Sequence, residues 1–347
     1  MKTKKLLAGI LTLVLGFSVL GGCGTVGSST KVGTTTKNKH IVLNMAIQPS
    51  MAFLPLYEAK EHGWIEEALK KTGYDVEVNW TESSSGPPMN EAFAAGQQDI
   101  GVCGDVPLVK AVADGQDNKF IAVAAEGGPA YSILVPVGSD IQSAQDLKGK
   151  TIGVTLGSTA QYLISLYLKA NGMDMNTDVE LISIEGGDAQ SFLSQGGADA
   201  VALWEPNVSR LVESGTAEIL ASGDECGLLA VNCLFARTDF VESYPEIAQI
   251  VLAQYYRGAM AYEEDKESVA VELAAYFDLT PELMINAADK YAYNVVWRNE
   301  DVTALQGTAD FLYETENIDR EIDVSEYAYY WELAKKAVES MAEESSR

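Results

Sequence analysis

Two kinds of apolar segment alternate along residues 40–230 of the chain. Short runs of consecutive apolar residues, such as His40–Ile47 and Ala200–Leu203, are typical of buried strands. Longer segments in which apolar residues recur about every 3.6 positions, such as Ser158–Ala170, predict helices. Because strands and helices that alternate in this way form sheets joined by crossover helices, we expect an α/β fold.

The alternation begins near His40 and begins again at Thr151. Strands are predicted at residues 40–47, 74–80, 99–103, 120–125 and 132–136, and then at 151–155, 179–184 and 200–203. A Gly-x-x-Asp turn recurs at Gly96–Asp99 and Gly196–Asp199, each time between a helix and an apolar strand. The two matching halves predict two lobes. From Tyr244 onward the pattern is mostly helical, and we expect these helices to pack on the first lobe.

Residues 1–39 show a different pattern. Three lysines within residues 2–5 precede an apolar run of 15 residues, which is shorter than the roughly 20 that span a bilayer as a helix. The string Leu20-Gly21-Gly22-Cys23 is similar to a lipobox, so we expect a signal peptide at 1–22 and an extracytoplasmic protein held at the membrane by lipid on Cys23. The alternative is an ordinary signal peptide with an incidental cysteine. Residues 23–39, rich in Gly, Ser, Thr and Lys, are predicted to be a flexible tether.

The charge of the chain is strongly negative. It has 24 basic and 50 acidic residues and a formal net charge of −26. A nucleic-acid-binding surface needs a basic footprint, so the composition argues against that class of partner. An acidic surface of this kind favours solubility.

Cysteines and histidines are few. Cys226 and Cys233 could close a disulfide in an oxidising compartment or remain two free thiols, and their spacing does not decide between these alternatives. Cys103 lies in an apolar run and is predicted to be a core residue. With two histidines, His40 and His62, and no Cys/His cluster of zinc spacing, we expect no metal site and no cofactor.

Small and polar residues follow the predicted strands where the next helix begins. In an open α/β sheet, ligands bind outside the carboxyl ends of the strands, facing these helix starts. Free backbone N–H groups there bind anions without a basic side chain, and Ser and Thr hydroxyls add donors. Any one such residue could be a plain helix cap, but six junctions in matching places favour a shared cleft for a sulfonate, sulfate, nitrate or carboxylate. The junctions are Gln48-Pro49-Ser50, Ser83–Gly86, Gly104-Asp105, Gly157–Thr159, Gly187-Asp188 and Trp204–Pro206.

Three acidic residues, Asp105, Asp188 and Glu205, lie at these junctions and would repel an anion. If they cap helices or pair with basic side chains outside the pocket, they do little harm to anion binding. If they face the ligand, an amino-sulfonate fits better than a simple anion.

Five strings, in this order, resemble segments of the aliphatic-sulfonate, taurine and nitrate solute-binding proteins of ABC importers. They are FLPLYEAKEHGWIEEAL (53–69), GDVPLVKAVADG (104–115), DLKGKTIGV (146–154), GSTAQYLISLYLKANGM (157–173) and GDAQSF…GGADAVALWEP (187–206). Each string alone is a weak signal, whereas the ordered set covers most of residues 43–210. Beyond residue 240 the resemblance is looser.

The resemblance implies a type II periplasmic-binding fold, in which two lobes joined by two crossovers close on a ligand between them. Residues 40–130 and 231–347 would form lobe 1, and residues 131–230 would form lobe 2. It also implies a monomer that passes a small anionic ligand to a membrane permease. Carried over position by position, the binding residues would be Gln48, Ser85, Gly86, Gly104, Asp105, Ser158, Thr159, Asp188 and Trp204.

The function that the resemblance implies is binding of an aliphatic sulfonate or taurine. Nitrate and a thiamine-pyrimidine precursor are alternative ligands, because the segments Ser83–Ser85 and Glu126–Pro129 depart from the family pattern. A ligand sensor is an alternative role. An enzyme is disfavoured, because the sequence has no Gly-x-Ser-x-Gly elbow and because Ala144 stands where a phosphate-binding loop needs Gly.

Overall fold

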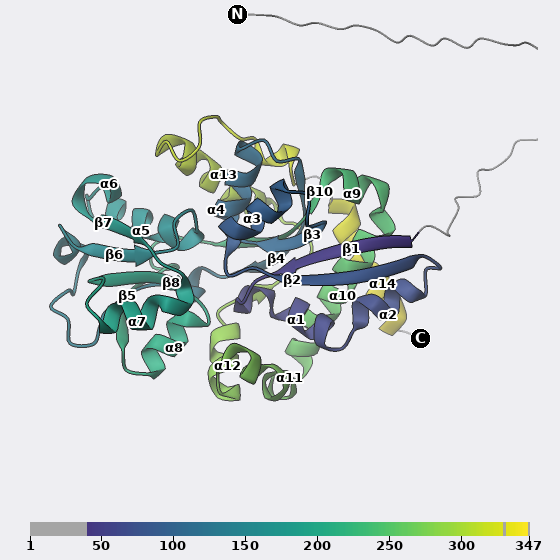
Figure 1. Ribbon diagram of the computed structural model, residues 1–347, viewed down its shortest axis with the longest axis horizontal. Coiled ribbons are helices and arrows are strands. Elements are labelled where there is room, and N and C mark those ends of the chain that lie inside the picture. The colour runs from purple at the N-terminus through teal and green to yellow at the C-terminus, as the bar shows by residue number, and fades with distance from the viewer. Residues whose placement is uncertain (1–39, 329–330, 346–347) are drawn as a thin grey trace, which may run out of the picture. The chain divides into compact units, whose positions relative to one another are not determined.

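The computed structural model describes residues 40–328 and 331–345, and their strands form two sheets (Figure 1). The first sheet has six strands in the order β11-β4-β10-β3-β1-β2, and the second has five in the order β7-β6-β8-β5-β9. The predicted signal peptide, the predicted lipidation site at Cys23 and the predicted tether lie outside the described residues.

The first sheet is of mixed direction. Strand β1 pairs in parallel with β2 and β3, and β10 lies antiparallel between β3 and β4. Its strands are β1 (His40–Ile47), β2 (Asp75–Glu82), β3 (Ile100–Cys103), β4 (Asn118–Glu126), β10 (Val231–Arg237) and β11 (Ala292–Tyr293). The fully buried run of β3 is typical of a strand covered on both faces.

The second sheet repeats this arrangement. Strand β6 pairs in parallel with β7 and β8, and β5 lies antiparallel between β8 and β9. Its strands are β5 (Tyr131–Pro136), β6 (Thr151–Val154), β7 (Glu180–Ser183), β8 (Ala200–Trp204) and β9 (Ala217–Ser222). In both sheets the antiparallel strand in the interior of the sheet, β10 or β5, is the one that follows a passage of the chain from the other sheet. Strand β11 is also antiparallel, and it pairs with β4 at the edge of the first sheet.

The chain passes between the sheets twice, after β4 and after β9. The two passages lie against each other, and the backbone N–H of Gly127 donates to the carbonyl of Leu229 at 3.2 Å. We propose lobe boundaries at 130/131 and 230/231, and the sheet to which each strand belongs supports them.

Helices follow most of the parallel strands. The helices α1 (Leu54–Glu61), α2 (Trp64–Lys70), α3 (Gly86–Ala94) and α4 (Asp105–Ala113) accompany the first sheet. The helices α5 (Thr159–Ala170), α6 (Met175–Asp178), α7 (Ala189–Ser194) and α8 (Asn207–Glu213) accompany the second. Short 3-10 turns come before some of them, including η1 (Met51–Phe53) before α1.

The C-terminal third is helical and packs on elements of the first sheet. Helix α10 contacts α1 and α2, α13 contacts α4, and α14 contacts α10 and β4 (Figure 1). The hydroxyl of Tyr255 in α10 donates to the carbonyls of Ala52 and Ala124, each at 3.1 Å. The C-terminal helices are α9 (Thr238–Ser243), α10 (Pro245–Glu264), α11 (Lys266–Leu273), α12 (Pro281–Ala288), α13 (Asn299–Glu314) and α14 (Trp331–Ser345).

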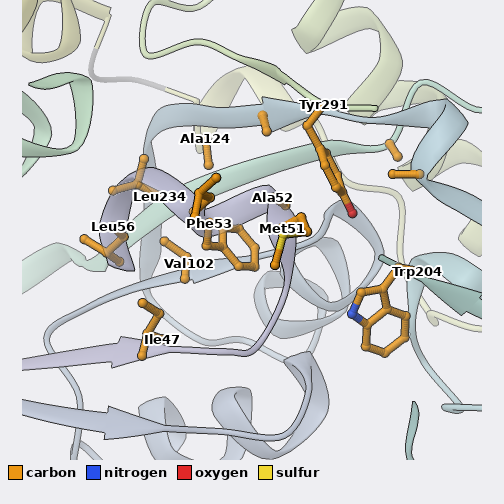
Figure 2. Packing of buried hydrophobic residues seen from close by; sticks show 14 of the residues in the cluster. Ile47, Met51, Ala52, Phe53, Leu56, Val102, Ala124, Trp204, Leu234 and Tyr291 are labelled. Atoms are coloured by element: carbon orange, nitrogen blue, oxygen red, sulfur yellow. The ribbon is translucent and has the colours of Figure 1, made fainter. Parts of the chain in front are cut away.

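The core of the first sheet reaches the carboxyl end of β1, where Gln48 and Ser50 follow. Phe53 of η1 packs among apolar side chains of the central strands, including Val102 and Leu234 (Figure 2). Burying each such side chain contributes about 1.5–3 kcal/mol. Figure 2 also shows Trp204 of the second sheet at the edge of this cluster. The carboxyl end of β1 is therefore held rigidly by its own core.

Candidate ligand-binding site

A small cavity lies where helices of both sheets begin. It has about 300 Å³ of empty space, including its mouth. Its walls are Gln48, Ser50, Gly86, Gly104, Pro107, Tyr131, Ser158, Thr159, Trp204 and Asn232. Four of these residues stand at or next to the first residue of α3, α4 or α5. The first N–H groups of a helix lack acceptors within the helix, so the starts of α3, α4 and α5 can offer donors here. Their number is limited, because Pro87, Pro88 and Pro107 have no N–H and the N–H groups of Val106 and Gln161 donate to side chains.

Helix α5 begins at the cavity because Ser158 caps it. Ser158 is in an extended conformation, and its hydroxyl oxygen accepts a hydrogen bond from the backbone N–H of Gln161 at 3.4 Å. The hydroxyl proton of Ser158 is not used by this contact. Ser158 can therefore cap the helix and donate to a ligand at the same time.

The starts of α3 and α4 need glycine because other atoms come very close. A Cβ atom on Gly86 would lie 2.5 Å from Cγ of Pro107 and 2.8 Å from Sγ of Cys103. A Cβ atom on Gly104 would lie 2.7 Å from the hydroxyl oxygen of Thr159, which belongs to the other sheet's helix α5. Gly104 is thus the residue that allows α4 and α5 to meet.

Asp105 lies behind the cavity wall and is 2% exposed. Its carboxylate accepts hydrogen bonds from the hydroxyls of Thr159, at 2.6 Å, and Thr308, at 3.0 Å, and from the N–H of Val106. Burial raises the pKa of Asp105 above its ordinary value, and these hydrogen bonds oppose the rise. The carboxylate joins α4 to α5 and is not among the residues that line the cavity.

The remaining two junction acids, Glu205 and Asp188, do not line the cavity either. Glu205 is completely buried, accepts from the N–H and hydroxyl of Ser209, and pairs with Lys290. Asp188 is exposed, caps no helix with its side chain, and does not line the cavity. An anion in the cavity would therefore meet no acidic side chain in its wall.

Tyr131 and Asn232 stand at the beginnings of β5 and β10, directly after the two passages between the sheets. The hydroxyl of Tyr131 donates to the amide oxygen of Asn232 at 3.3 Å, and the amide nitrogen donates to the carbonyls of Ala125 and Ala230. Burial raises the pKa of Tyr131, so its hydroxyl stays protonated. This pair places two polar groups at the base of the cavity.

Ser85 directly precedes Gly86 and is completely buried. In the described part of the chain its hydroxyl has no hydrogen-bond partner. Because buried hydroxyls are nearly always paired, this one marks a position where a ligand atom or water is expected.

The structure brings most of the predicted binding residues together. Gln48, Gly86, Gly104, Ser158, Thr159 and Trp204 line the cavity, Ser85 and Asp105 stand next to lining residues, and Asp188 lies apart. Ser50, Pro107, Tyr131 and Asn232 also line the cavity and were not among the predicted residues. The sequence does place Ser50 and Pro107 at predicted junctions, but it gives no local signal for Tyr131 or Asn232.

A second, more apolar cavity shares Ser158 with the first. Its lining includes Tyr162 of α5 and Phe311 of α13, whose rings lie 4.3 Å apart. Met175 adds a further apolar side chain, and Lys110 and Gln161 add polar ones. An organic group attached to an anion in the first cavity could extend here.

The disulfide considered between Cys226 and Cys233 is not formed in the structure. Cys103, Cys226 and Cys233 are all free thiols. Cys233 is buried inside β10 and lies opposite Cys103 in β3, whereas Cys226 is half-buried in the passage before β10. The alternative of free thiols is the one that the structure shows.

The described residues contain no membrane-spanning helix but do contain one possible metal-binding group. No helix in residues 40–328 and 331–345 combines the length and apolar character of a membrane span. One group of side chains there, Glu58, His62 and Glu272, has the geometry to hold a metal ion. It shares no residue with the lining of the binding cavity.

Comparison with known proteins identifies the family. Residues 50–268, more than half of the chain, match the family model described as NMT1/THI5 like. The chain belongs to the NMT1/THI5-like family. A relative from Bacillus subtilis (strain 168), provisionally named an aliphatic sulfonates-binding protein, is 33% identical over 319 residues, which are 92% of this chain and 93% of that one.

Two further likenesses extend this family assignment. The taurine-binding periplasmic protein of Escherichia coli (strain K12) is 27% identical over 175 residues, covering 50% of this chain and 53% of its own. The solved alkanesulfonate-binding protein SsuA from Xanthomonas axonopodis pv. citri, bound to MOPS, is 26% identical with a TM-score of 0.76, covering 82% of this chain and 97% of its own. The resemblance to this group of proteins and the type II periplasmic-binding fold are thereby confirmed.

Proposed function

We propose that this NMT1/THI5-like protein is the extracytoplasmic solute-binding component of an ABC importer. Its ligand is a small aliphatic sulfonate, held by the starts of α3, α4 and α5. The observation that carries the proposal is the convergence of these helix N-termini on one cavity whose walls contain no charged side chain. Such a site favours an anion through backbone dipoles and hydroxyl donors. The names of the similar proteins point to the same ligand class.

The cavity favours a sulfonate with an apolar tail over taurine. The ammonium group of taurine would need a carboxylate or several acceptors, but Asp105 and Glu205 are already committed to other partners. The neighbouring cavity offers Tyr162, Phe311 and Met175 to an alkyl chain. Each methylene buried there contributes about 0.8 kcal/mol. We therefore infer that a short alkanesulfonate is the better ligand.

The same proposal covers the location of the protein and the absence of a catalytic activity. The apolar run before Cys23 and the polar stretch after it support export, lipid attachment and a tethered position outside the membrane. A monomer that closes on its ligand and then docks on a permease needs no catalytic group. Ligand capture by a site that supplies only hydrogen bonds supports a binding protein without enzymatic activity.

Isothermal titration in a Tris buffer tests the ligand class. MOPS and related buffers are themselves sulfonates and would occupy the site. The panel is butanesulfonate, taurine, sulfate, nitrate and an aminomethyl-pyrimidine. We expect one-to-one binding of butanesulfonate, weaker binding of taurine, and the weakest response from the remaining compounds. Binding of nitrate or the pyrimidine with no response to any sulfonate would overturn the proposal.

A further inference from the structure

A cluster of three metal-ligating side chains lies in the first sheet's layer of helices, away from the binding cavity. Glu58 and His62 are one helical turn apart at the end of α1, and Glu272 comes from α11. Nε2 of His62 lies 3.0 Å from Oε1 of Glu58 and 3.5 Å from Oε2 of Glu272. One ligand atom from each residue falls within 4.8 Å of the other two.

These separations are close to those of a coordination shell. In a tetrahedral zinc site with bonds of about 2.0–2.1 Å, neighbouring ligand atoms lie about 3.4 Å apart. Both carboxylates approach the same ring nitrogen. His62 and Glu272 are each more than a third exposed, so a metal ion could enter and keep a water ligand.

The buried oxygen of Glu58 is a second and independent sign of a ligand. Glu58 is 3% exposed, and its Oε2 has no hydrogen-bond partner among the described residues. A buried carboxylate oxygen without a donor is costly, because the charge has lost its water. A cation bound by the carboxylate would satisfy it.

The local charge also favours a cation. In the described residues, His62 is the one basic group paired with Glu58 or Glu272, and Glu61 adds a further negative charge nearby. The C-terminal carbonyls of α1 contribute negative partial charge at the same place. Two further basic side chains are close by but pair with aromatic rings: Lys60 lies over Tyr57, Trp80 and Tyr276. Arg257 lies over Trp64, the ring on which His62 also stacks.

We propose that Glu58, His62 and Glu272 form a binding site for a divalent transition-metal ion of the zinc type. Two carboxylates and one imidazole provide three ligands, and water completes the shell. The ion links the end of α1 to α11 and so connects the C-terminal helices to the helices of the first sheet. His62 and Glu272 are 210 residues apart in the sequence. This role is separate from capture of the solute.

The test is titration of the full mature chain, without a polyhistidine tag, with ZnCl₂ in a buffer that is neither a sulfonate nor a strong chelator. We expect one saturable site and a rise in melting temperature. His62→Ala and Glu272→Gln should each weaken Zn²⁺ binding at least tenfold, because changes even around a metal's ligands cost about 10–100-fold. Ca²⁺ and Mg²⁺ should bind at least tenfold more weakly than Zn²⁺, because imidazole suits transition metals.

His40 supplies a matched control. It too lies beside two acids, Asp75 and Glu77, but these contact different ring nitrogens. His40→Ala should leave Zn²⁺ affinity within twofold of the parent, and Cys226→Ser should do the same. All variants should keep their circular dichroism spectrum and their butanesulfonate affinity, so that a folding defect is recognised.

Replacement of Zn²⁺ by Co²⁺ gives a spectroscopic readout. Visible d–d bands should appear on addition of Co²⁺ and be lost in His62→Ala. The proposal is overturned if Zn²⁺ does not saturate a site, if His62→Ala binds as the parent does, or if Ca²⁺ competes equally. The contacts of His62 with Glu58 and Glu272 would then hold the helices together without a metal ion.

Discussion

The two sides of the binding cavity offer different chemistry to a ligand. The side built on the first sheet has glycine at the starts of α3 and α4, and its other lining residues are Gln48, Ser50, Pro107 and Asn232. The side built on the second sheet has no glycine in the lining and presents the side chains of Tyr131, Ser158, Thr159 and Trp204. The comparison teaches that the first side allows the close approach, whereas both sides supply polar side chains. Asp105, from the first side, holds Thr159, from the second.

Substitution of Gly104 tests the close approach and should have the largest effect. In Gly104→Val the new Cβ would lie 2.7 Å from the Thr159 hydroxyl, and two methyl groups would add to the conflict. Overpacking of this kind costs about 3 kcal/mol, so butanesulfonate affinity measured by titration should fall about a hundredfold.

Gly187→Val is the control for this substitution. Gly187 begins the matching junction of the second sheet, and a Cβ there has no neighbour within 4 Å. The butanesulfonate affinity of Gly187→Val should stay within about twofold of that of the parent, as for other surface substitutions. Equal losses in the two variants would show that the contact between α4 and α5 is not what Gly104 protects.

Removal of the Ser158 hydroxyl tests the side-chain contacts. Ser158→Ala should weaken butanesulfonate binding by about tenfold or more, because a hydrogen bond to a charged ligand is worth about 1.5–3 kcal/mol. The double variant with Thr159→Ala should lose more than Ser158→Ala alone, since the link to Asp105 is also removed. Titration of both variants with butanesulfonate measures the effect. An unchanged affinity in the double variant would show that the start of α5 does not contact the ligand.

The raised pKa of Asp105 makes the stability of the folded protein depend on pH in a predictable direction. This pKa is raised in the folded protein by burial, so in the pH range between its ordinary value and the raised value the folded state holds a proton that the unfolded state has lost. Stability from this group is present at low pH and is lost as pH rises through that window. The melting temperature of Asp105→Asn minus that of the parent should therefore become more positive as the pH rises above about 4, the ordinary pKa of an aspartate. A difference that falls over this range would contradict the assignment.

Asp188 should show the smallest effect. It stands at a helix start, as Asp105 does, but it is exposed and lies outside the cavity lining. Asp188→Ala should change butanesulfonate affinity by less than about twofold, as surface substitutions usually do. A tenfold loss in the titration would mean that the second sheet brings α7 to the ligand.

The contrast between Asp105 and Asp188 also shows how far the sequence could predict the site. Both follow a glycine at a predicted junction, and the local pattern does not distinguish them. Their environments differ because Thr159 and Thr308, 54 and 203 residues away in the chain, pack against Asp105 alone. Burial of a polar residue depends on such distant contacts and cannot be read from neighbouring positions.

The fold was predictable where the local sequence pattern determines the secondary structure. Runs such as His40–Ile47 and the capped helix that begins after Ser158 have clear local signals. Strand β10 was not predicted, although it lies between β3 and β4, because it pairs only with segments more than 100 residues earlier. Tyr131 and Asn232 were not predicted for the same reason, since they reach the cavity wall through contacts between segments about 100 residues apart.

The metal-ligand cluster extends this lesson. The sequence contains two histidines and no Cys/His motif, which predicts no transition-metal site. Glu58 and His62 have the spacing of one helical turn, but the third ligand, Glu272, comes from α11. A site assembled from a helix pair and a distant carboxylate has no short motif by which it could be found.

A crystal structure with 2-bromoethanesulfonate would test the central claim most directly. The anomalous signal of bromine fixes the orientation of the ligand. The account predicts that the sulfonate lies between the starts of α4 and α5, within hydrogen-bonding distance of the Ser158 hydroxyl, with bromine toward Tyr162 and Phe311. A sulfonate bound away from these helix starts, or held there by a lysine or arginine side chain, would contradict it.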